Sequence, residues 1–102
     1  MRKIIDGKVY DTATAEKVAE NWNGIDSNDF NYLNEEVYKT KKGKFFLFGE
    51  GGAATRYATH SGQWSNEGED IHPLSENEVK ELLEDWKEVD KYEELFGAPE
   101  EA

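Results

Sequence analysis

The segment from Phe30 to Glu50 constrains the fold most, because its apolar side chains alternate along two strand-like runs. The runs are FNYLNEEVYKT (30–40) and KFFLFGE (44–50), and Lys42-Gly43 breaks the pattern between them. Alternate residues of a strand point to the same face, so two such runs joined by a glycine turn pair readily. The segment therefore predicts a β-hairpin with an aromatic core face.

Other segments predict further strands and one early helix. Asp6-Gly7 between apolar pairs predicts a tight hairpin near the N-terminus, since both turn residues tolerate positive φ. In TATAEKVAENW (12–22), apolar residues recur at i, i+3, i+4 and i+7, which predicts a helix. The remaining expectations are a glycine-rich joint (GEGGAAT, 49–55), a strand (TRYATH, 55–60) and an edge strand ended by Pro73 (EDIHPL, 69–74).

The last third predicts a helix that begins with a capping box. Ser75 and Glu78 stand three apart, so each side chain can bond the backbone amide of the other. Residues 90–97 either continue this helix or form a second short one. The order of elements predicts an α+β fold, an antiparallel β-sheet (β-hairpin, helix, β-meander) with a C-terminal acidic helix packed on one face. We expect one domain over residues 1–97 and a flexible acidic tail over 98–102.

Negative charge is concentrated in the last third of the chain. The formal net charge is −11, yet residues 1–66 are neutral, and residues 67–102 hold fourteen acids against three lysines. Such a field repels nucleic acids and anionic membranes and attracts basic surfaces. We therefore expect a basic protein partner, no direct binding of nucleic acid, and no membrane association.

Part of this charge forms a row on a helical wheel. With residues 76–91 placed at 100° per residue, Glu78, Glu81, Asp85 and Glu88 gather on one flank and the lysines on another. Carboxylates one turn apart stand about 5–6 Å from each other, a spacing on the scale of backbone phosphates. The row is a candidate partner-binding site, and a solvated helix face without function is the alternative. Its acidic neighbours Asp90, Glu93 and Glu94 are included in the candidate site.

Residue types that carry catalysis or metal binding do not occur at useful spacings. Asp26 and Asp29 suggest a calcium loop, but Asn31 stands where an EF-hand has glycine, so we predict turns built on Asp and Asn side chains. There is no cysteine, and the two histidines lack a third ligand at metal-site spacing. We therefore predict no catalytic residues, no metal and no cofactor. The enzyme alternative would use His60 with Glu35 or Glu36.

Trp64 is the one large apolar residue in a polar loop, SGQWSNEGED (61–70). It is either an interface anchor or a ring folded over the sheet edge, and both interpretations stay open. The longest apolar run, residues 45–48, is too short for a membrane span, and the N-terminus lacks the apolar stretch of a signal peptide. We expect a cytoplasmic protein of a bacterial cell, of unassigned oligomeric state.

Three segments together resemble a family of small acidic proteins from plasmids, phages and conjugative elements of Gram-positive bacteria. They are DFNYLNEEVYKTKKGKFFLFGEGGAATRYA (29–58), IHPLSENEVKELLEDW (71–86) and DKYEELFG (90–97), whose shared motifs are turn glycines, core aromatics and a helix cap. Such mobile-element proteins are similar to anti-CRISPR inhibitors of the nuclease Cas9. The resemblance implies a non-catalytic inhibitor that occupies a nucleic-acid channel of Cas9 and blocks guide RNA or target DNA. An inhibitor of another defence nuclease, an adaptor and an antitoxin-like partner are alternatives.

Overall fold

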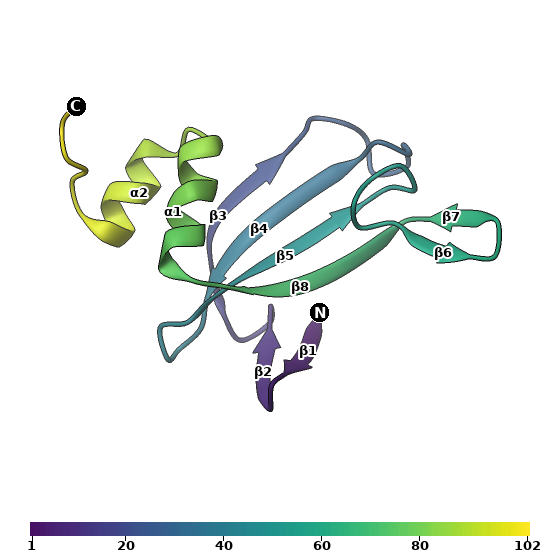
Figure 1. Cartoon of the computed structure of the whole chain (residues 1–102), viewed down its shortest axis with the longest axis horizontal. Coiled ribbons are helices and arrows are strands. Elements are labelled where there is room, and N and C mark those ends of the chain that lie inside the picture. The colour runs from purple at the N-terminus through teal and green to yellow at the C-terminus, as the bar shows by residue number, and fades with distance from the viewer.

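A computed structural model describes residues 1–102 as an α+β structure, with eight strands in antiparallel sheets followed by two C-terminal helices (Figure 1). The fold class predicted from the sequence is confirmed. The central sheet has the strand order β3-β4-β5-β8, and β1-β2 and β6-β7 form two separate hairpins. The elements are β1 (Arg2–Ile5), β2 (Lys8–Asp11), β3 (Glu16–Trp22), β4 (Leu33–Lys39), β5 (Phe45–Gly51), β6 (Thr59–Ser61), β7 (Trp64–Asn66), β8 (Gly68–Leu74), α1 (Glu76–Asp85) and α2 (Val89–Phe96).

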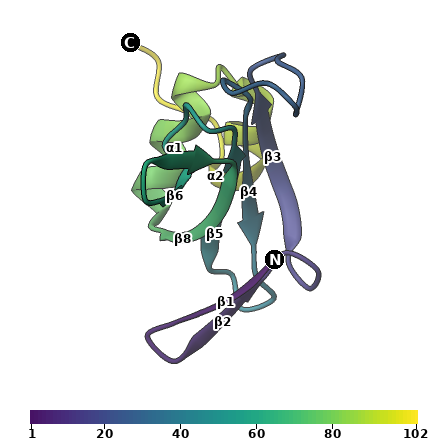
Figure 2. The same ribbon diagram turned by 90° about the vertical axis from the view of Figure 1, so that its right-hand side faces the viewer.

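The two faces of the central sheet are covered differently (Figure 2). One face, which we call the helix face, carries Val37 and Leu47, and these pack against Val79 and Leu83 of α1. The opposite face, which we call the open face, carries Phe46, and the β1-β2 hairpin packs on its apolar end through Tyr10. The other end of the open face carries mostly polar side chains together with Trp22, and it lies outside both apolar clusters.

The helix predicted over residues 12–22 is wrong, because residues 16–22 form the edge strand β3. The register with β4 shifts between Lys17 and Ala19, which is a β-bulge at Val18. The bulge turns both Val18 and Ala19 into the core of the helix face. Because Val18 and Ala19 are adjacent and both point inward, their positions in the sequence match the i+3 and i+4 positions of a helical apolar stripe. Trp22, the last residue of the supposed helical stripe, is 57% exposed on the open face.

The glycine-rich segment is not a joint, because Gly49 and Gly51 are paired residues of β5. A Cβ on Gly49 would stand 1.9 Å from the Tyr57 ring, and one on Gly52 would stand 2.3 Å from the Asp29 carbonyl oxygen. These positions carry no side chain because the neighbouring segments pack directly on the backbone. The strand predicted over residues 55–60 is also shorter, since β6 contains only its last part and pairs with β7.

Several local predictions are confirmed. The segment 30–50 contains the β4-β5 hairpin, and Asp6 and Gly7 turn between β1 and β2 with φ values of 51° and 75°. β8 is an edge strand as predicted, but Pro73 does not end it, because Pro73 and Leu74 are still paired with β5. Backbone amides of the 26–31 turns donate to side chains of Asp26 and Asp29. Phe46 of the predicted aromatic face is buried, and Tyr32, Tyr38 and Phe48 are half-buried. Tyr57, from the segment 55–60, is buried as well.

The helical region begins as predicted and breaks once. Ser75 Oγ accepts the Glu78 amide at 3.2 Å, and Glu78 Oε1 accepts the Ser75 amide at 2.9 Å, so the capping box is present. Lys87 adopts a φ of 59° after α1, and α2 is a second short helix rather than a continuation. Gly97, with a φ of 85°, ends α2. Neither helix has the length and apolar character that a membrane span requires.

Candidate functional site

Three of the predicted binding residues form an exposed row on α1. Glu78, Glu81 and Asp85 stand at i, i+3 and i+7, so they share one side of the helix. α1 packs on the sheet through Val79 and Leu83, which are fully buried. We call the three exposed carboxylates the acid row, and packing of the opposite side of α1 directs the row to solvent.

The charge of the acid row is not compensated within the chain. No basic side chain forms an ion pair with any acid of α1, and among the acids of residues 67–102 only Asp70 and Glu94 have a basic partner. Lys80 and Lys87 form no ion pair with Glu76 or Glu84, the acids that stand four and three residues before them in the sequence. Lys80 Nζ lies instead 5.0 Å from the centroid of the Phe96 ring. The electrostatic field of α1 is therefore available to an external cation.

The other predicted helical acids belong to a neighbouring surface rather than to the same row. The wheel that treated residues 76–91 as one helix is wrong at its end, because α1 stops at Asp85 and Glu88 is the N-cap of α2. α2 packs on the core of the helix face through its apolar side. The remaining three predicted acids are exposed on α2, Asp90, Glu93 and Glu94.

Trp64 lies far from the acid row. It is the first residue of β7 and is 77% exposed, so the interpretation as a ring folded over the sheet edge is wrong. The β6-β7 hairpin projects at the end of the molecule opposite to α1 and α2, along the 48 Å axis (Figure 1). The structure therefore does not combine Trp64 and the acid row into one site. Its role as an interface anchor stays a prediction.

A second acidic surface lies on the open face, and the sequence analysis missed it. Glu20 of β3 stands directly opposite Glu36 of β4, although like charges in cross-strand pairs are destabilising. The next register position forms a row across all four strands, Trp22, Asn34, Glu50 and Glu69. Glu20, Glu36 and Glu50 come from residues 1–66, which are neutral overall, so only strand pairing brings these acids together. The strand register was the signal that could have found them.

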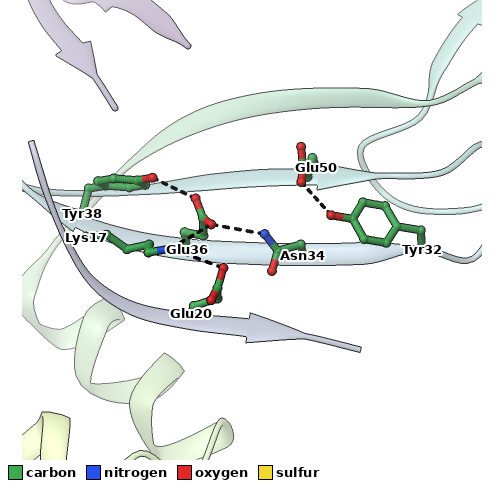
Figure 3. A network of polar contacts seen from close by, with 7 residues as sticks. All are labelled: Lys17, Glu20, Tyr32, Asn34, Glu36, Tyr38 and Glu50. Carbon is green, nitrogen blue, oxygen red and sulfur yellow. Dashed lines mark hydrogen bonds and ion pairs between the residues drawn. The ribbon is translucent and has the colours of Figure 1, made fainter. Parts of the chain in front are cut away.

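Glu36 is the central acceptor of this surface (Figure 3). The Tyr38 hydroxyl donates to it at 2.8 Å and Asn34 Nδ2 donates to it at 3.3 Å. Lys17 Nζ lies 3.5 Å from a carboxylate oxygen of both Glu20 and Glu36, so one ammonium serves two acids. Burial alone would raise the pKa of Glu36, but the hydrogen bonds and the Lys17 charge outweigh it and lower the pKa. Glu36 is therefore ionised near neutral pH.

Two aromatic rings at this surface are held by their polar ends. The Tyr32 hydroxyl donates to Glu50 at 2.6 Å, and burial together with this carboxylate raises the pKa of Tyr32 to about 12. Trp22 Nε1 donates to the carbonyl oxygen of Ile25 at 2.8 Å. The orientation of both rings is therefore set before any partner arrives.

The acids considered for the enzyme alternative have structural partners. Glu35 is 4% exposed on the helix face and accepts one hydrogen bond, from the Tyr57 hydroxyl, with the Arg56 guanidinium 3.5 Å away. His60 is exposed on β6 and forms no hydrogen bond or ion pair with Glu35 or Glu36. The pairing on which the enzyme alternative depends is therefore absent from this arrangement.

Comparisons of the chain with known protein families, with curated protein sequences and with solved structures find no match.

Proposed function

We propose that the chain is a non-catalytic protein inhibitor that binds a basic nucleic-acid-binding protein, Cas9 foremost, through α1 and α2. The observation that carries the proposal is the acid row, three exposed carboxylates without a basic partner in the chain. Like-charge neighbours at helical spacing destabilise a helix by a few tenths of a kcal/mol per pair. Contact with arginines and lysines of a partner relieves that repulsion.

The spacing of the acid row suits a surface that normally grips a nucleic-acid backbone. Arginine and lysine side chains that contact phosphates bind carboxylates through the same charge-assisted hydrogen bonds. Cas9 holds its guide heteroduplex in a positively charged channel and reads a short duplex with arginines. A protein that occupies such a surface blocks guide RNA or target DNA without binding either of them.

The choice of Cas9 as first partner rests on the sequence motifs. The segments 29–58, 71–86 and 90–97 resemble mobile-element proteins of the anti-CRISPR kind. An inhibitor of this kind acts in the cytoplasm of the bacterial host. The acid row alone also fits another basic defence nuclease, and the experiment below separates the two.

The structure dictates which acids to change in the test. Glu78 closes the capping box, so its reversal to lysine would weaken the start of α1 as well as the charge. We therefore combine Glu78→Gln, which keeps an acceptor at the cap, with Glu81→Lys and Asp85→Lys. A matched control reverses the charge of Glu100 and Glu101, which lie beyond the helices.

Target cleavage by Cas9 is measured with each protein added in excess. We expect the wild-type chain and the tail control to inhibit cleavage, and the α1 variant to lose inhibition with an unchanged circular dichroism spectrum. Equal inhibition by all three proteins contradicts a role for the acid row. If the wild-type chain does not inhibit, Cas9 is not the partner, and the same variants are compared against other defence nucleases.

A further inference from the structure

The open face carries a pocket that the proposed inhibitor surface does not use. We propose that this pocket binds an arginine side chain, presented by a basic segment of a partner protein. The pocket is an open hollow of about 380 Å³ between β3, β4 and the loop that joins them. Its lining combines two acids, two aromatic rings, a hydroxyl and an amide, Glu20, Asp26, Trp22, Tyr32, Ser27 and Asn34.

The side-chain carbonyl oxygen of Asn34 lacks a hydrogen-bond donor. Asn34 is 7% exposed, and its Oδ1 has no hydrogen-bond partner in the protein. The amide cannot be reversed, because Nδ2 donates to Glu36 and an oxygen in that place would face a carboxylate. Figure 3 shows Oδ1 pointing away from Glu36, on the side where Glu20 lies. A buried carbonyl without a donor is unfavourable, and a donor from a partner removes that penalty.

The charge around this oxygen selects a cation as the donor. Glu20 shares its ammonium partner, Lys17, with Glu36, so the two carboxylates together keep one uncompensated negative charge. Asp26 adds a third carboxylate at the rim of the pocket. Oδ1 is shielded from solvent, so a cation that enters between Asn34 and Glu20 must first displace the side chains that cover this oxygen. It then meets a carbonyl oxygen and a carboxylate at once, which makes both hydrogen bonds stronger.

The aromatic rings favour a guanidinium over an ammonium. Trp22 is 57% exposed, although its indole N–H is occupied by Ile25, so the ring face is what it offers to a ligand. The Tyr32 ring is held in the same way by Glu50. A guanidinium is planar, stacks on such rings and directs several N–H donors to separate acceptors, whereas an ammonium is a compact, strongly hydrated charge.

The acidic surface continues beyond one side chain, which points to a protein segment rather than a free amino acid. A second hollow shares Ser27 and Tyr32 with the first and extends over the ends of β5 and β8. Its lining adds three carboxylates, Glu50, Glu67 and Glu69. An extended segment with an arginine in the first hollow places its next basic residue over these acids.

The probe for the experiment is a blocked peptide, Gly-Arg-Gly-Arg-Gly, compared with versions in which lysine or citrulline replaces arginine. Citrulline keeps the shape of arginine without its charge. Binding to the full chain is followed at physiological salt by the NMR signals of the Trp22 indole N–H and the Asn34 side-chain amide. We expect the arginine peptide to shift both signals, the lysine peptide to bind several-fold more weakly, and the citrulline peptide to leave both unchanged.

Two variants test the residues that build the pocket. Asn34→Leu should weaken the arginine peptide about tenfold, the loss of one hydrogen bond to a charged group. Its midpoint of thermal unfolding should change little, because removal of the unpaired buried carbonyl offsets the loss of the Asn34 Nδ2 hydrogen bond to Glu36. Trp22→Leu, at an exposed position, should also lower affinity. Glu81→Gln on α1 is the matched control and should leave affinity unchanged.

Three results overturn the proposal. These are equal affinity for the arginine and lysine peptides, shifts confined to α1 and α2, and unchanged affinity in Asn34→Leu or Trp22→Leu. The pocket lies on the open face and the acid row on α1, so a failure here leaves the Cas9 assay with the α1 variant unaffected.

Discussion

The Tyr57 hydroxyl donates a hydrogen bond to the buried carboxylate of Glu35 on the helix face of the sheet. Burial and this carboxylate raise the pKa of Tyr57, so the hydroxyl stays a donor throughout the neutral range. The bond links the segment after β5 to the middle of β4. The Tyr57 ring fills the space above Gly49, because Gly49 has no side chain there.

Removal of this donor is expected to destabilise the fold. In Tyr57→Phe, Glu35 keeps only Arg56 as a partner, and Arg56 is largely exposed. The free energy of unfolding should fall by about 2 kcal/mol, since a buried acceptor loses a strong donor. Urea denaturation measures the loss. Tyr92→Phe, which removes a hydroxyl without a hydrogen-bond partner, is the control, and an equal loss in both variants would contradict the role of Glu35.

Gly49 is expected to tolerate no side chain while Tyr57 is present. Gly49→Ala places a Cβ within 1.9 Å of the ring, and displacement of the packed ring should cost about 3 kcal/mol. In the Tyr57→Ala background the same substitution should cost much less, because the obstacle is gone. Chemical denaturation of the two single variants and the double variant gives the coupling energy. Additive effects would show that the ring is not the obstacle.

The contact between Lys3 and Asp70 predicts a dependence of stability on acid pH. Burial alone would raise the pKa of Asp70, but the Lys3 ammonium and the Ile71 amide outweigh it and lower the pKa below its ordinary value of 3.8. A carboxyl group with a lowered folded-state pKa stabilises the fold above its unfolded pKa, and this stabilisation is lost as pH falls through the folded value.

Asp70→Asn should therefore lower the unfolding midpoint at pH 7, with a difference from wild type that shrinks below pH 4. Thermal unfolding across this range measures it. Glu100→Gln in the tail removes one charge without a partner and should leave the midpoint near that of wild type at each pH. A constant difference across the pH range would show that Asp70 does not act through its charge.

The capping box predicts two different outcomes for its two members. Ser75→Ala removes the acceptor for the Glu78 amide and should lower the free energy of unfolding by about 1 kcal/mol. Glu78→Gln should have a smaller effect, because glutamine can still accept the Ser75 amide. Urea denaturation of both variants tests this order. The reverse order would mean that the charge at the helix start, rather than the cap geometry, dominates.

Local signals predicted much of the fold. The alternation in residues 30–50 and the Asp6-Gly7 turn are properties of neighbouring residues, and the capping box requires only Ser75 and Glu78. β3 was misassigned because the bulge at Val18 creates a helical spacing within a strand. A bulge depends on the partner strand, so the segment alone could not reveal it.

The same distinction, between features set by neighbouring residues and features set by strand pairing, applies to the two acidic surfaces. The acid row on α1 follows from the helical period, so the sequence predicted Glu78, Glu81 and Asp85 together. The open-face acids become neighbours only through the register of the strands, and a charge sum along the chain averages them with nearby lysines. The unpaired oxygen of Asn34 has no sequence signal, because its isolation depends on what surrounds it.

The measurement closest to the central claim is a gel shift of labelled guide RNA with purified Cas9. The protein is added before or after the guide, at low and at high salt. We predict that the wild-type chain blocks guide binding when added first, less so at high salt, and that the α1 variant (Glu78→Gln, Glu81→Lys and Asp85→Lys) does not block it. Guide loading in either order, followed by normal target cleavage, would contradict the claim that the acidic helices occupy a nucleic-acid-binding surface of Cas9.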